Sequence, residues 1–238
     1  MRFAPTAFAA ALALAAGSSF AAGEPVIGLI TKTETNPFFV KMKEGAEAEA
    51  KKLGAKLLSA AGKQDGDTAG QITAMENMVA AGAKTILITS SGDAIVPTIK
   101  KIKAQGVQVI ALDSPVPEAD ALFATNNYKA GELIGAYAKA TLGGKKAIIA
   151  TMDLFPGHPV GAQRHNGFLA GMGLKTLPME SNELAQPAEV ACMADSFGYA
   201  AKGQTGMENC LQKNANINVV YAINEPAAAG AYKALKAA

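Results

Sequence analysis

The sequence predicts an α/β fold with two Rossmann-like lobes, each a parallel sheet flanked by helices. Short runs rich in β-branched residues alternate with amphipathic segments from Pro25 onward, roughly 25 to 30 residues apart. This alternation begins again after Thr125. Strands that alternate with helices along a polypeptide form parallel sheets with right-handed crossovers. Two successive series of such units therefore predict two similar lobes.

The N-terminal lobe is predicted to span residues 24–125. Asn36 provides a capping side chain and Pro37 a first-turn proline for its first helix. Its second helix is expected to end at Gly82, and Pro97 marks the first turn of the third. The predicted strands are 26–30, 56–59, 85–89 and 107–112, and the predicted helices are 37–53, 67–81 and 94–104. A short apolar piece follows at 121–124.

The C-terminal lobe is predicted to span residues 126–238, with the boundary between the lobes near 125–127. Its pattern is less regular, because only two of its strand patterns are well defined. The predicted helices are 129–141, 160–172, 200–213 and 226–237, the clear strands are 147–151 and 219–222, and weaker strand patterns lie at 175–179 and 183–185.

Residues 1–21 have the pattern of a secretory signal peptide. Arg2 gives a positive start, residues 3–16 form an apolar run, and Ser19 and Ala21 occupy the −3 and −1 positions of a cleavage site after Ala21. A membrane anchor is the alternative, but the apolar run is shorter than the roughly 20 residues that a spanning helix needs. We therefore expect an exported protein.

Composition bears on the class of partner. Without residues 1–21 the sequence has 21 basic and 20 acidic residues. Nucleic acids and anionic membranes normally require a concentrated basic patch, so no nucleic-acid partner is expected.

Cys192 and Cys210 are the two cysteines. In an oxidising compartment they are candidates for a disulfide, with free thiols as the alternative, and without a nearby histidine they make a poor metal site.

Polar side chains follow the predicted strands. Ligands of a doubly wound sheet bind beyond the carboxyl ends of its strands, where this protein has carboxylates, amides and small hydroxyls. Such groups match the hydroxyls of a neutral polyol, which both donate and accept hydrogen bonds. Phe38 and Phe39 offer apolar faces that pack on a sugar ring. Their other interpretation is one core residue and one hydrophobic staple.

The same loops argue against catalysis, so no catalytic residue, metal or cofactor is expected. The glycine pair Gly143-Gly144 precedes a strand rather than opening a helix, so it is no phosphate loop. The sequence has no G-x-S-x-G nucleophile elbow. His158 and His165 are seven residues apart, whereas a ligand pair on one helix usually has i, i+4 spacing. They are interpreted as surface or capping histidines.

Five motifs in register resemble the type I periplasmic sugar-binding proteins of ABC transporters, the ribose-binding protein class. The motifs are Thr35-Asn36-Pro37-Phe38-Phe39, Ala111-Leu112-Asp113, Ala124-Thr125-Asn126-Asn127, Arg164-His165-Asn166-Gly167-Phe168 and Tyr221-Ala222-Ile223-Asn224-Glu225. The resemblance covers residues 25–238. Together with Asp153 and 202–205, the runs 30–39 and 164–168 look most similar to the fructose-binding members.

This resemblance implies a set of ligand contacts. The amides, the carboxylate and the arginine would bind sugar hydroxyls, and the two phenylalanines would stack on the ring. The implied residues are Asn36, Phe38, Phe39, Asp113, Arg164 and Asn224, with Lys32 and Thr89 at loop positions where relatives often contact the ligand. Ser114 stands where relatives commonly have an arginine, which argues against a ribose-type hydroxyl pattern. Phe197 or Tyr199 would close the site from the second lobe.

The resemblance also implies a role. The sugar would be bound between two lobes in the periplasm, and a monomeric protein would deliver it to permease subunits in the inner membrane without catalysing a reaction. Relatives continue past the equivalent of Ala238, so the C-terminal lobe is expected to be incomplete and the sequence truncated at its C-terminus. The alternatives are a binding protein for another small polar ligand (a pentose, a polyol or a furanone signal) and a non-functional fragment.

Two other classes are disfavoured. A repressor of the related class would need an N-terminal helix-turn-helix, and the signal-peptide pattern occupies that place. An exported enzyme on a Rossmann-like fold would need a nucleophile and base or a phosphate loop, and the strand-end loops provide neither.

Overall fold

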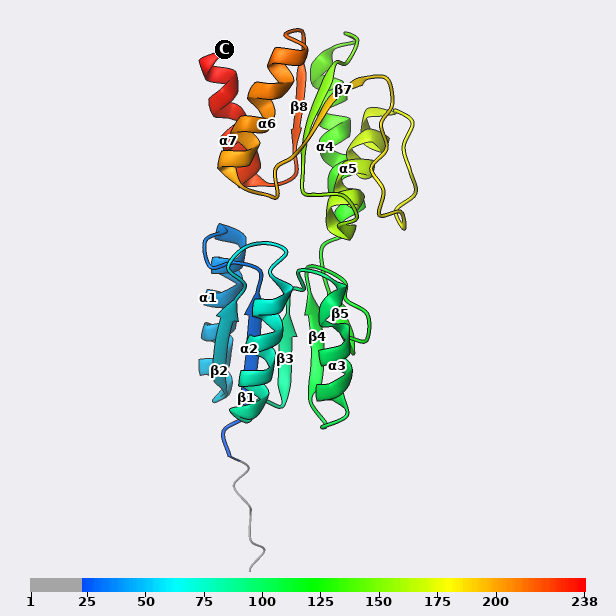
Figure 1. The fold of residues 1–238 in the computed structure, drawn as a ribbon. Coiled ribbons are helices and arrows are strands. Elements are labelled where there is room, and N and C mark those ends of the chain that lie inside the picture. Colours follow the sequence, from blue (N-terminus) through cyan, green and yellow to red (C-terminus); the bar gives the residue numbers. More distant parts are fainter. Residues whose placement is uncertain (1–22) are drawn as a thin grey trace, which may run out of the picture.

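The protein folds into two α/β lobes, which lie one above the other in Figure 1. This computed structural model describes residues 23–238, so the predicted signal peptide of residues 1–21 lies outside the described residues. The predicted fold class is confirmed, because both sheets are parallel and helices flank each of them. Helices of the described residues are too short or too polar to cross a membrane.

The N-terminal lobe has a five-stranded sheet in the order β2-β1-β3-β4-β5. Since β2 and β3 pair with opposite edges of β1, the right-handed crossovers put α1 on one face and α2 with α3 on the other (Figure 1). Its strands are β1 (Val26–Thr31), β2 (Lys56–Ala61), β3 (Thr85–Ile88), β4 (Gln108–Leu112) and β5 (Ala121–Phe123), and its helices are α1 (Pro37–Leu53), α2 (Thr68–Ala80), the short 3-10 helix η1 (Asp93–Ile95) and α3 (Val96–Lys103).

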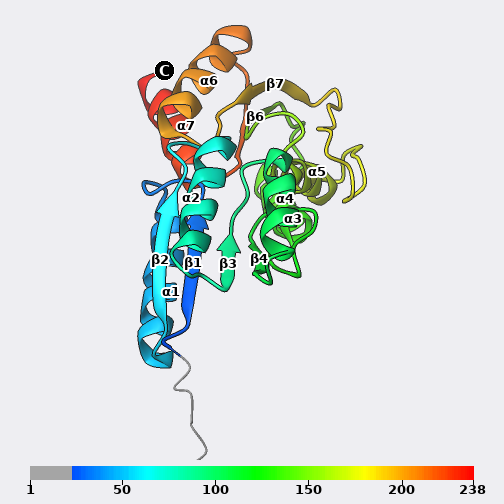
Figure 2. The ribbon, with the colours of Figure 1, turned by 60° about the horizontal axis from the view of Figure 1, so that its bottom comes forward.

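The C-terminal lobe has a three-stranded sheet in the order β7-β6-β8. Its helices form two packed pairs, α4 with α5 and α6 with α7, which lie on either side of the sheet (Figure 2). Its strands are β6 (Ile149–Asp153), β7 (Val190–Asp195) and β8 (Val219–Ala222), and its helices are α4 (Asn127–Leu142), α5 (Pro159–Met172), α6 (Ala200–Lys213) and α7 (Glu225–Ala237).

Most predicted elements are present. The apolar piece at 121–124 forms strand β5, and the other main differences fall in 173–199. The weak strand patterns at 175–179 and 183–185 are not strands in the structure, and Pro178 lacks the N–H that a sheet ladder needs. The strand that pairs with β6 is instead β7, which the sequence did not reveal. Its residues include a single β-branched side chain, Val190, so its strand propensity is low.

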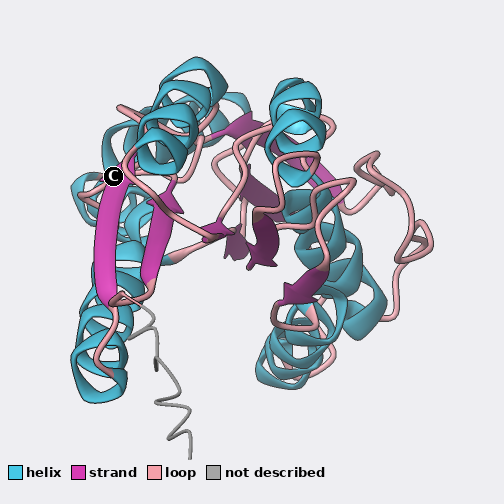
Figure 3. Cartoon of the chain, turned by 90° about the horizontal axis from the view of Figure 1, so that it is seen from below, coloured by secondary structure: helices cyan, strands magenta, loops and turns pink. Residues whose placement is uncertain are grey.

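Each lobe has its own apolar core. Figure 3, which views the molecule from below, shows helices packed beside the strands of both sheets. Ile30, Ile86 and Ile99 are fully buried in the first lobe, and Ile149 and Phe168 in the second. Removing such side chains from water is the dominant favourable contribution to folding. The two cores are separate, so each lobe is stabilised largely by its own contacts.

A disulfide and a surface groove are further features of the second lobe. Cys192 of β7 and Cys210 of α6 form a disulfide in the structure. On the opposite side β8 is an outer strand, and a groove of about 540 Å³ lies between it and α4. Tyr137 and Ile134 of α4 line this groove and are well exposed.

Candidate ligand-binding site

The polar loops at the carboxyl ends of the strands meet between the two lobes. They enclose a cavity of about 90 Å³ that both lobes line. Seven of the eight predicted site residues lie around it, and their contacts with a ligand stay a prediction. The lining residues are Lys32, Asn36, Phe38, Phe39, Asp65, Asp113, Leu154, His158, Val160, Arg164, Ile223, Asn224 and Glu225.

Thr89 is the predicted residue that does not line the cavity. It is fully buried, and its hydroxyl donates to the carbonyl of Ile30 at 3.4 Å. Its own carbonyl accepts a hydrogen bond from Nε2 of Gln71 at 2.8 Å. These bonds tie the end of β3 to β1 and α2, so Thr89 supports the loop rather than facing the cavity.

Two asparagines reach the cavity because they cap helices. The Oδ1 of Asn36 accepts from the amide of Phe38 at 3.0 Å, at the start of α1. The Oδ1 of Asn224 accepts from the amide of Ala227 at 3.0 Å, at the start of α7. Capping fixes the orientation of both side chains. The Nδ2 of Asn224 also donates to the carbonyl of Gly198 at 3.3 Å.

Phe38 and Phe39 differ in burial, although both lie at the cavity. Their ring centroids are 5.3 Å apart and the rings meet edge to face. Phe39 is 6% exposed and packs into the lobe, whereas Phe38 is 45% exposed. Both line the cavity, so the first helical turn presents an apolar wall that a sugar ring can contact.

Asp113 is held in a strained conformation at the end of β4. Its φ is +60°, a left-handed conformation that costs about 1 kcal/mol or more for a residue other than glycine. The amide of Asp113 donates to the carbonyl of Phe123 at 2.8 Å, which keeps the residue in place. The hydroxyl of Ser114 donates to its Oδ2 at 3.3 Å. Such strain is typical of functional positions.

Arg164 reaches the cavity from α5 and is anchored on both sides. Its Nε donates to Oδ1 of Asn127, the first residue of α4, at 2.8 Å. Its Nη1 donates to the carbonyl of Ile223 at 3.1 Å. Two of the five guanidinium donors are therefore used to hold the side chain, and the others remain for a ligand oxygen.

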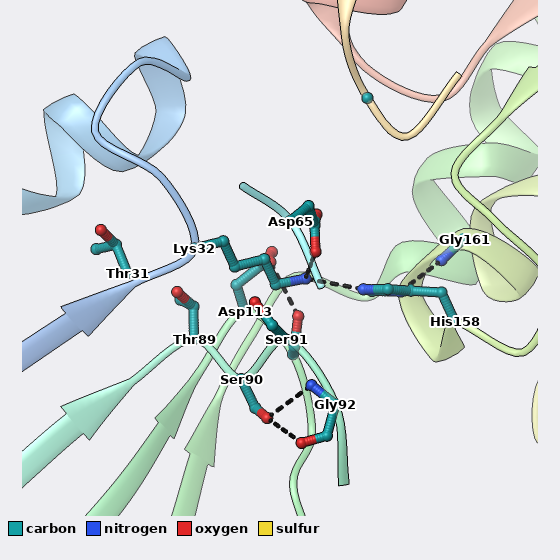
Figure 4. A network of polar contacts seen from close by, with 12 residues as sticks. Thr31, Lys32, Asp65, Thr89, Ser90, Ser91, Gly92, Asp113, His158 and Gly161 are labelled. Atoms are coloured by element: carbon teal, nitrogen blue, oxygen red, sulfur yellow. Dashed lines mark hydrogen bonds and ion pairs between the residues drawn. The ribbon is translucent and has the colours of Figure 1, made fainter. Parts of the chain in front are cut away.

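Lys32 links the two lobes across the cavity (Figure 4). Its Nζ lies 2.8 Å from Nε2 of His158 and 3.7 Å from Oδ1 of Asp65. Only 2% of Lys32 is exposed. Burial lowers its pKa, against the opposing effect of the neighbouring Asp65 and Asp113 carboxylates.

The interpretation of the histidines needs a correction. His158 is indeed a cap, since its Nδ1 accepts from the amide of Gly161 at 3.4 Å at the start of α5, but it is buried rather than on the surface. Burial and the nearby Lys32 cation lower the pKa of His158 to about 3. The packing of the second lobe against Lys32 of the first removes His158 from the surface.

His165 is neither a surface nor a capping residue. It is fully buried, and its Nδ1 lies 2.8 Å from Oδ1 of Asp153. Burial disfavours its charged form, but the Asp153 carboxylate outweighs burial and raises the pKa of His165. Asp153, which the sequence associates with a strand-end loop, therefore belongs to a buried polar pair and does not line the cavity.

The sequence did not identify Asp65 or the role of Tyr199. Asp65 follows β2 and lines the cavity just described. It also lines a second cavity of about 90 Å³, together with Asn36, Phe197 and Tyr199. The rule that ligands bind beyond strand ends applies to the loop after β2 as it does to the others, and applying it there would have singled out this loop, which holds both Asp65 and Asp67.

Within residues 23–238, no group of three or more histidine, cysteine, aspartate or glutamate side chains could hold a metal ion. The chemistry of the cavity is instead that of hydrogen bonding and ring packing. Amide, carboxylate and guanidinium groups converge on it from two lobes, with an aromatic wall on one side. This arrangement fits a small ligand rich in hydroxyl groups.

Comparison with known proteins assigns the family. Residues 27–238 match the family model described as periplasmic binding protein domain. The chain belongs to this family.

Two curated relatives and one solved structure illustrate the match. The ribose import binding protein of Bacillus subtilis is 31% identical over 215 residues, which cover 89% of this chain and 66% of the relative. The D-apiose import binding protein of Actinobacillus succinogenes is 28% identical over 233 residues, covering 96% of this chain and 71% of the relative. A solute-binding protein of an ABC transporter from Mycobacterium smegmatis, solved with bound glycerol, superimposes with a TM-score of 0.79 at 26% identity, covering 90% of this chain and 71% of that one.

Proposed function

We propose that this protein is the substrate-binding component of a sugar ABC transporter, which binds a neutral monosaccharide between its two lobes. The observation that carries the proposal is the interlobe cavity lined by Asn36, Asp113, Arg164 and Asn224 beside two phenylalanines. Hydroxyls that donate are matched by carboxylate and amide oxygens, and hydroxyls that accept are matched by the guanidinium and amide N–H groups. The location is the periplasm, and the recipient of the sugar is a permease in the inner membrane.

The charges around the cavity support an uncharged ligand. Three carboxylates line it, those of Asp65, Asp113 and Glu225, against the cations of Lys32 and Arg164. Arg164 already donates to two groups of the protein. A phosphorylated or acidic sugar would add negative charge where carboxylates are in excess, which costs free energy in a partly buried site.

The relatives support a monosaccharide, since their names specify ribose and D-apiose. A fructose-like ligand is proposed from the sequence motifs, with Ser114 in place of the arginine typical of ribose binders. Pentoses, polyols and a furanone signal are the alternatives. The proposal includes no chemical reaction.

The test is isothermal titration calorimetry of the purified protein with D-fructose, D-ribose, D-apiose, D-allose and glycerol, each in its own titration. Fructose 6-phosphate serves as the anionic control. The expected result is saturable one-to-one binding of at least one neutral sugar and no binding of the phosphate. Recovery of the bound sugar unchanged would support a role in binding alone. If the folded protein binds none of the neutral compounds, the sugar assignment is wrong.

A further inference from the structure

The loop between β2 and α2 places the carboxylate of Asp65 in the site, and one of its oxygens accepts no hydrogen bond from the described residues. Asp65 lies in this loop, between the two cavities at the lobe interface. Its side chain is 12% exposed, and its Oδ1 is buried without a hydrogen-bond partner among residues 23–238. A buried carboxylate oxygen without a donor is costly, so its presence in a cavity requires an explanation.

Lys32 does not supply the missing hydrogen bond. Its Nζ is 3.7 Å from Oδ1 of Asp65, which is ion-pair distance but too long for a hydrogen bond. The same Nζ lies 2.8 Å from Nε2 of His158, its closer partner. Figure 4 shows the lysine extended between the two groups. Burial raises the pKa of Asp65, against the opposing effects of the Lys32 cation and the Gly66 backbone amide.

The second lobe holds this loop in position. The hydroxyl oxygen of Tyr199 accepts a hydrogen bond from the backbone amide of Asp65 at 2.7 Å. Tyr199 lies at the start of α6, directly after Phe197 and Gly198, two residues with positive φ. Asp65 is therefore positioned by a contact that exists only when the two lobes are together, and in that arrangement the residue lines the cavity.

We propose that Asp65 is a specificity-determining residue that accepts a hydrogen bond from one hydroxyl of the bound sugar, and that Tyr199 is the positioning residue that holds it. The inference rests on the function proposed above and deepens it. It assigns a further acceptor to the site, from a strand end that the sequence motifs do not include. A ligand without a hydroxyl at that position leaves the carboxylate unpaired and binds more weakly.

The first experiment compares Asp65→Asn and Asp65→Ala with Glu34→Gln by calorimetry, using the neutral sugar that binds best to the unsubstituted protein. Glu34 is exposed on the loop after β1 and does not line either cavity, so its variant removes one negative charge without touching the site. Loss of a hydrogen bond to a charged group corresponds to at least about tenfold weaker binding. We expect this loss for both Asp65 variants and an unchanged dissociation constant for Glu34→Gln.

The second experiment identifies the hydroxyl. The monodeoxy derivatives of the same sugar are titrated into the unsubstituted protein and into Asp65→Ala. One derivative should bind at least about tenfold more weakly than the parent sugar to the unsubstituted protein. The same derivative should bind as well as the parent sugar to Asp65→Ala, because the acceptor is gone. A residue with a purely structural role would weaken parent and derivative alike.

Tyr199→Phe tests the positioning role, because it removes the hydroxyl and keeps the ring. We expect several-fold weaker binding of the parent sugar, and no further loss when Tyr199→Phe is added to Asp65→Ala. Additive losses in the double variant would contradict the positioning role.

The outcomes separate this inference from the proposed function. If no neutral sugar binds to the unsubstituted protein, the proposed function fails first. If a sugar binds and Asp65→Asn, shown to be folded by circular dichroism, binds it equally well, the function stands and the role of Asp65 is overturned. Equal ratios of parent to deoxy affinity in both proteins would also overturn it.

Discussion

At the scale of single residues, most of the polar residues that the sequence predicts for the site are held by contacts within the protein before any ligand binds. Asn36 and Asn224 cap helices, Arg164 is anchored on Asn127 and on a backbone carbonyl, and Asp113 is kept at positive φ. Binding then costs little side-chain entropy, because these groups are ordered in advance.

Asp113 provides the first prediction. Substitution of Asp113 by alanine removes the carboxylate that we propose accepts hydrogen bonds from sugar hydroxyls, so affinity should fall by about one to two orders of magnitude. Calorimetry with the best-binding sugar measures the loss. Asp113→Asn keeps the size and tolerates positive φ better than alanine, so it should retain more of the stability while also binding weakly. An unchanged dissociation constant for a folded Asp113→Ala variant would rule out the role.

His158 provides a prediction about pH. Its pKa is lowered to about 3 in the folded protein, whereas the unfolded state protonates near 6.5. The unfolded state therefore binds more protons between these values, and the free energy of unfolding falls as pH decreases from 6.5 toward 3, by up to about 1.4 kcal/mol per pH unit. Urea unfolding over this range should show a shallower decline for His158→Gln than for the unsubstituted protein. His165, present in both proteins, has a raised pKa and acts in the opposite direction. Parallel pH profiles would contradict this assignment.

Much of the site follows from sequence because strand ends and caps have local signals. Asn36 before a proline and two phenylalanines is visible as a helix start, and the structure puts these residues at the cavity. Asp65 and Asp67 share one loop, however, and the sequence does not distinguish them. Asp67 caps α2, whereas Asp65 faces the cavity because of how the second lobe meets the loop. That relation depends on tertiary structure and has no local pattern.

At the scale of elements, closely packed helix pairs connect the fold to the site. A methyl group at Gly131 of α4 would overlap the carbonyl of Arg164, and one at Gly167 of α5 would overlap the carbonyl of Tyr128. Glycine thus allows the backbones of α4 and α5 to approach each other. Since Arg164 lies on α5 and its partner Asn127 on α4, this packing also sets the position of the guanidinium group.

We predict that Gly131→Ala both destabilises the protein and weakens sugar binding. The added methyl group must push α5 away, which typically costs about 1–3 kcal/mol, and the shift carries Arg164 with it. Gly45→Ala is the matched control, because Gly45 lies on the exposed side of α1 with open space around it. It should raise the free energy of unfolding by about 0.5–1 kcal/mol and leave affinity unchanged. Equal stability of the two variants would refute the packing argument.

The link between β7 and α6 gives a second element-scale prediction. The disulfide closes a loop with a sequence separation of 18 between Cys192 and Cys210, so the double substitution to alanine should lower the free energy of unfolding by about 3 kcal/mol. Thermal unfolding followed by circular dichroism measures the effect. A reducing agent should destabilise the unsubstituted protein and have no effect on the double variant.

Strand β7 itself was not predicted, since its side chains have weak strand propensity. Pairing with β6 determines its conformation.

At the scale of the whole molecule, the two lobes meet through polar contacts at the cavity. Lys32 contacts His158, and the amide of Asp65 contacts Tyr199. Each lobe has its own core, so relative motion of the lobes need not disturb either core. We expect a ligand that contacts both lobes to stabilise the arrangement in which they are together, the closed form, over one in which they are apart, the open form.

The contact between Lys32 and His158 should contribute to that equilibrium even without sugar. Loss of one buried polar contact of about 1–2 kcal/mol changes the closed-to-open ratio by roughly 5- to 30-fold. Fluorescent labels at Glu47 of α1 and Gln212 of α6, both exposed on different lobes, report the separation by single-molecule energy transfer. His158→Ala should increase the open fraction without sugar and require more sugar for closure. The same variant at saturating sugar should still reach the closed form, because the ligand contacts remain. An open fraction identical to that of the unsubstituted protein would show that the contact does not stabilise closure.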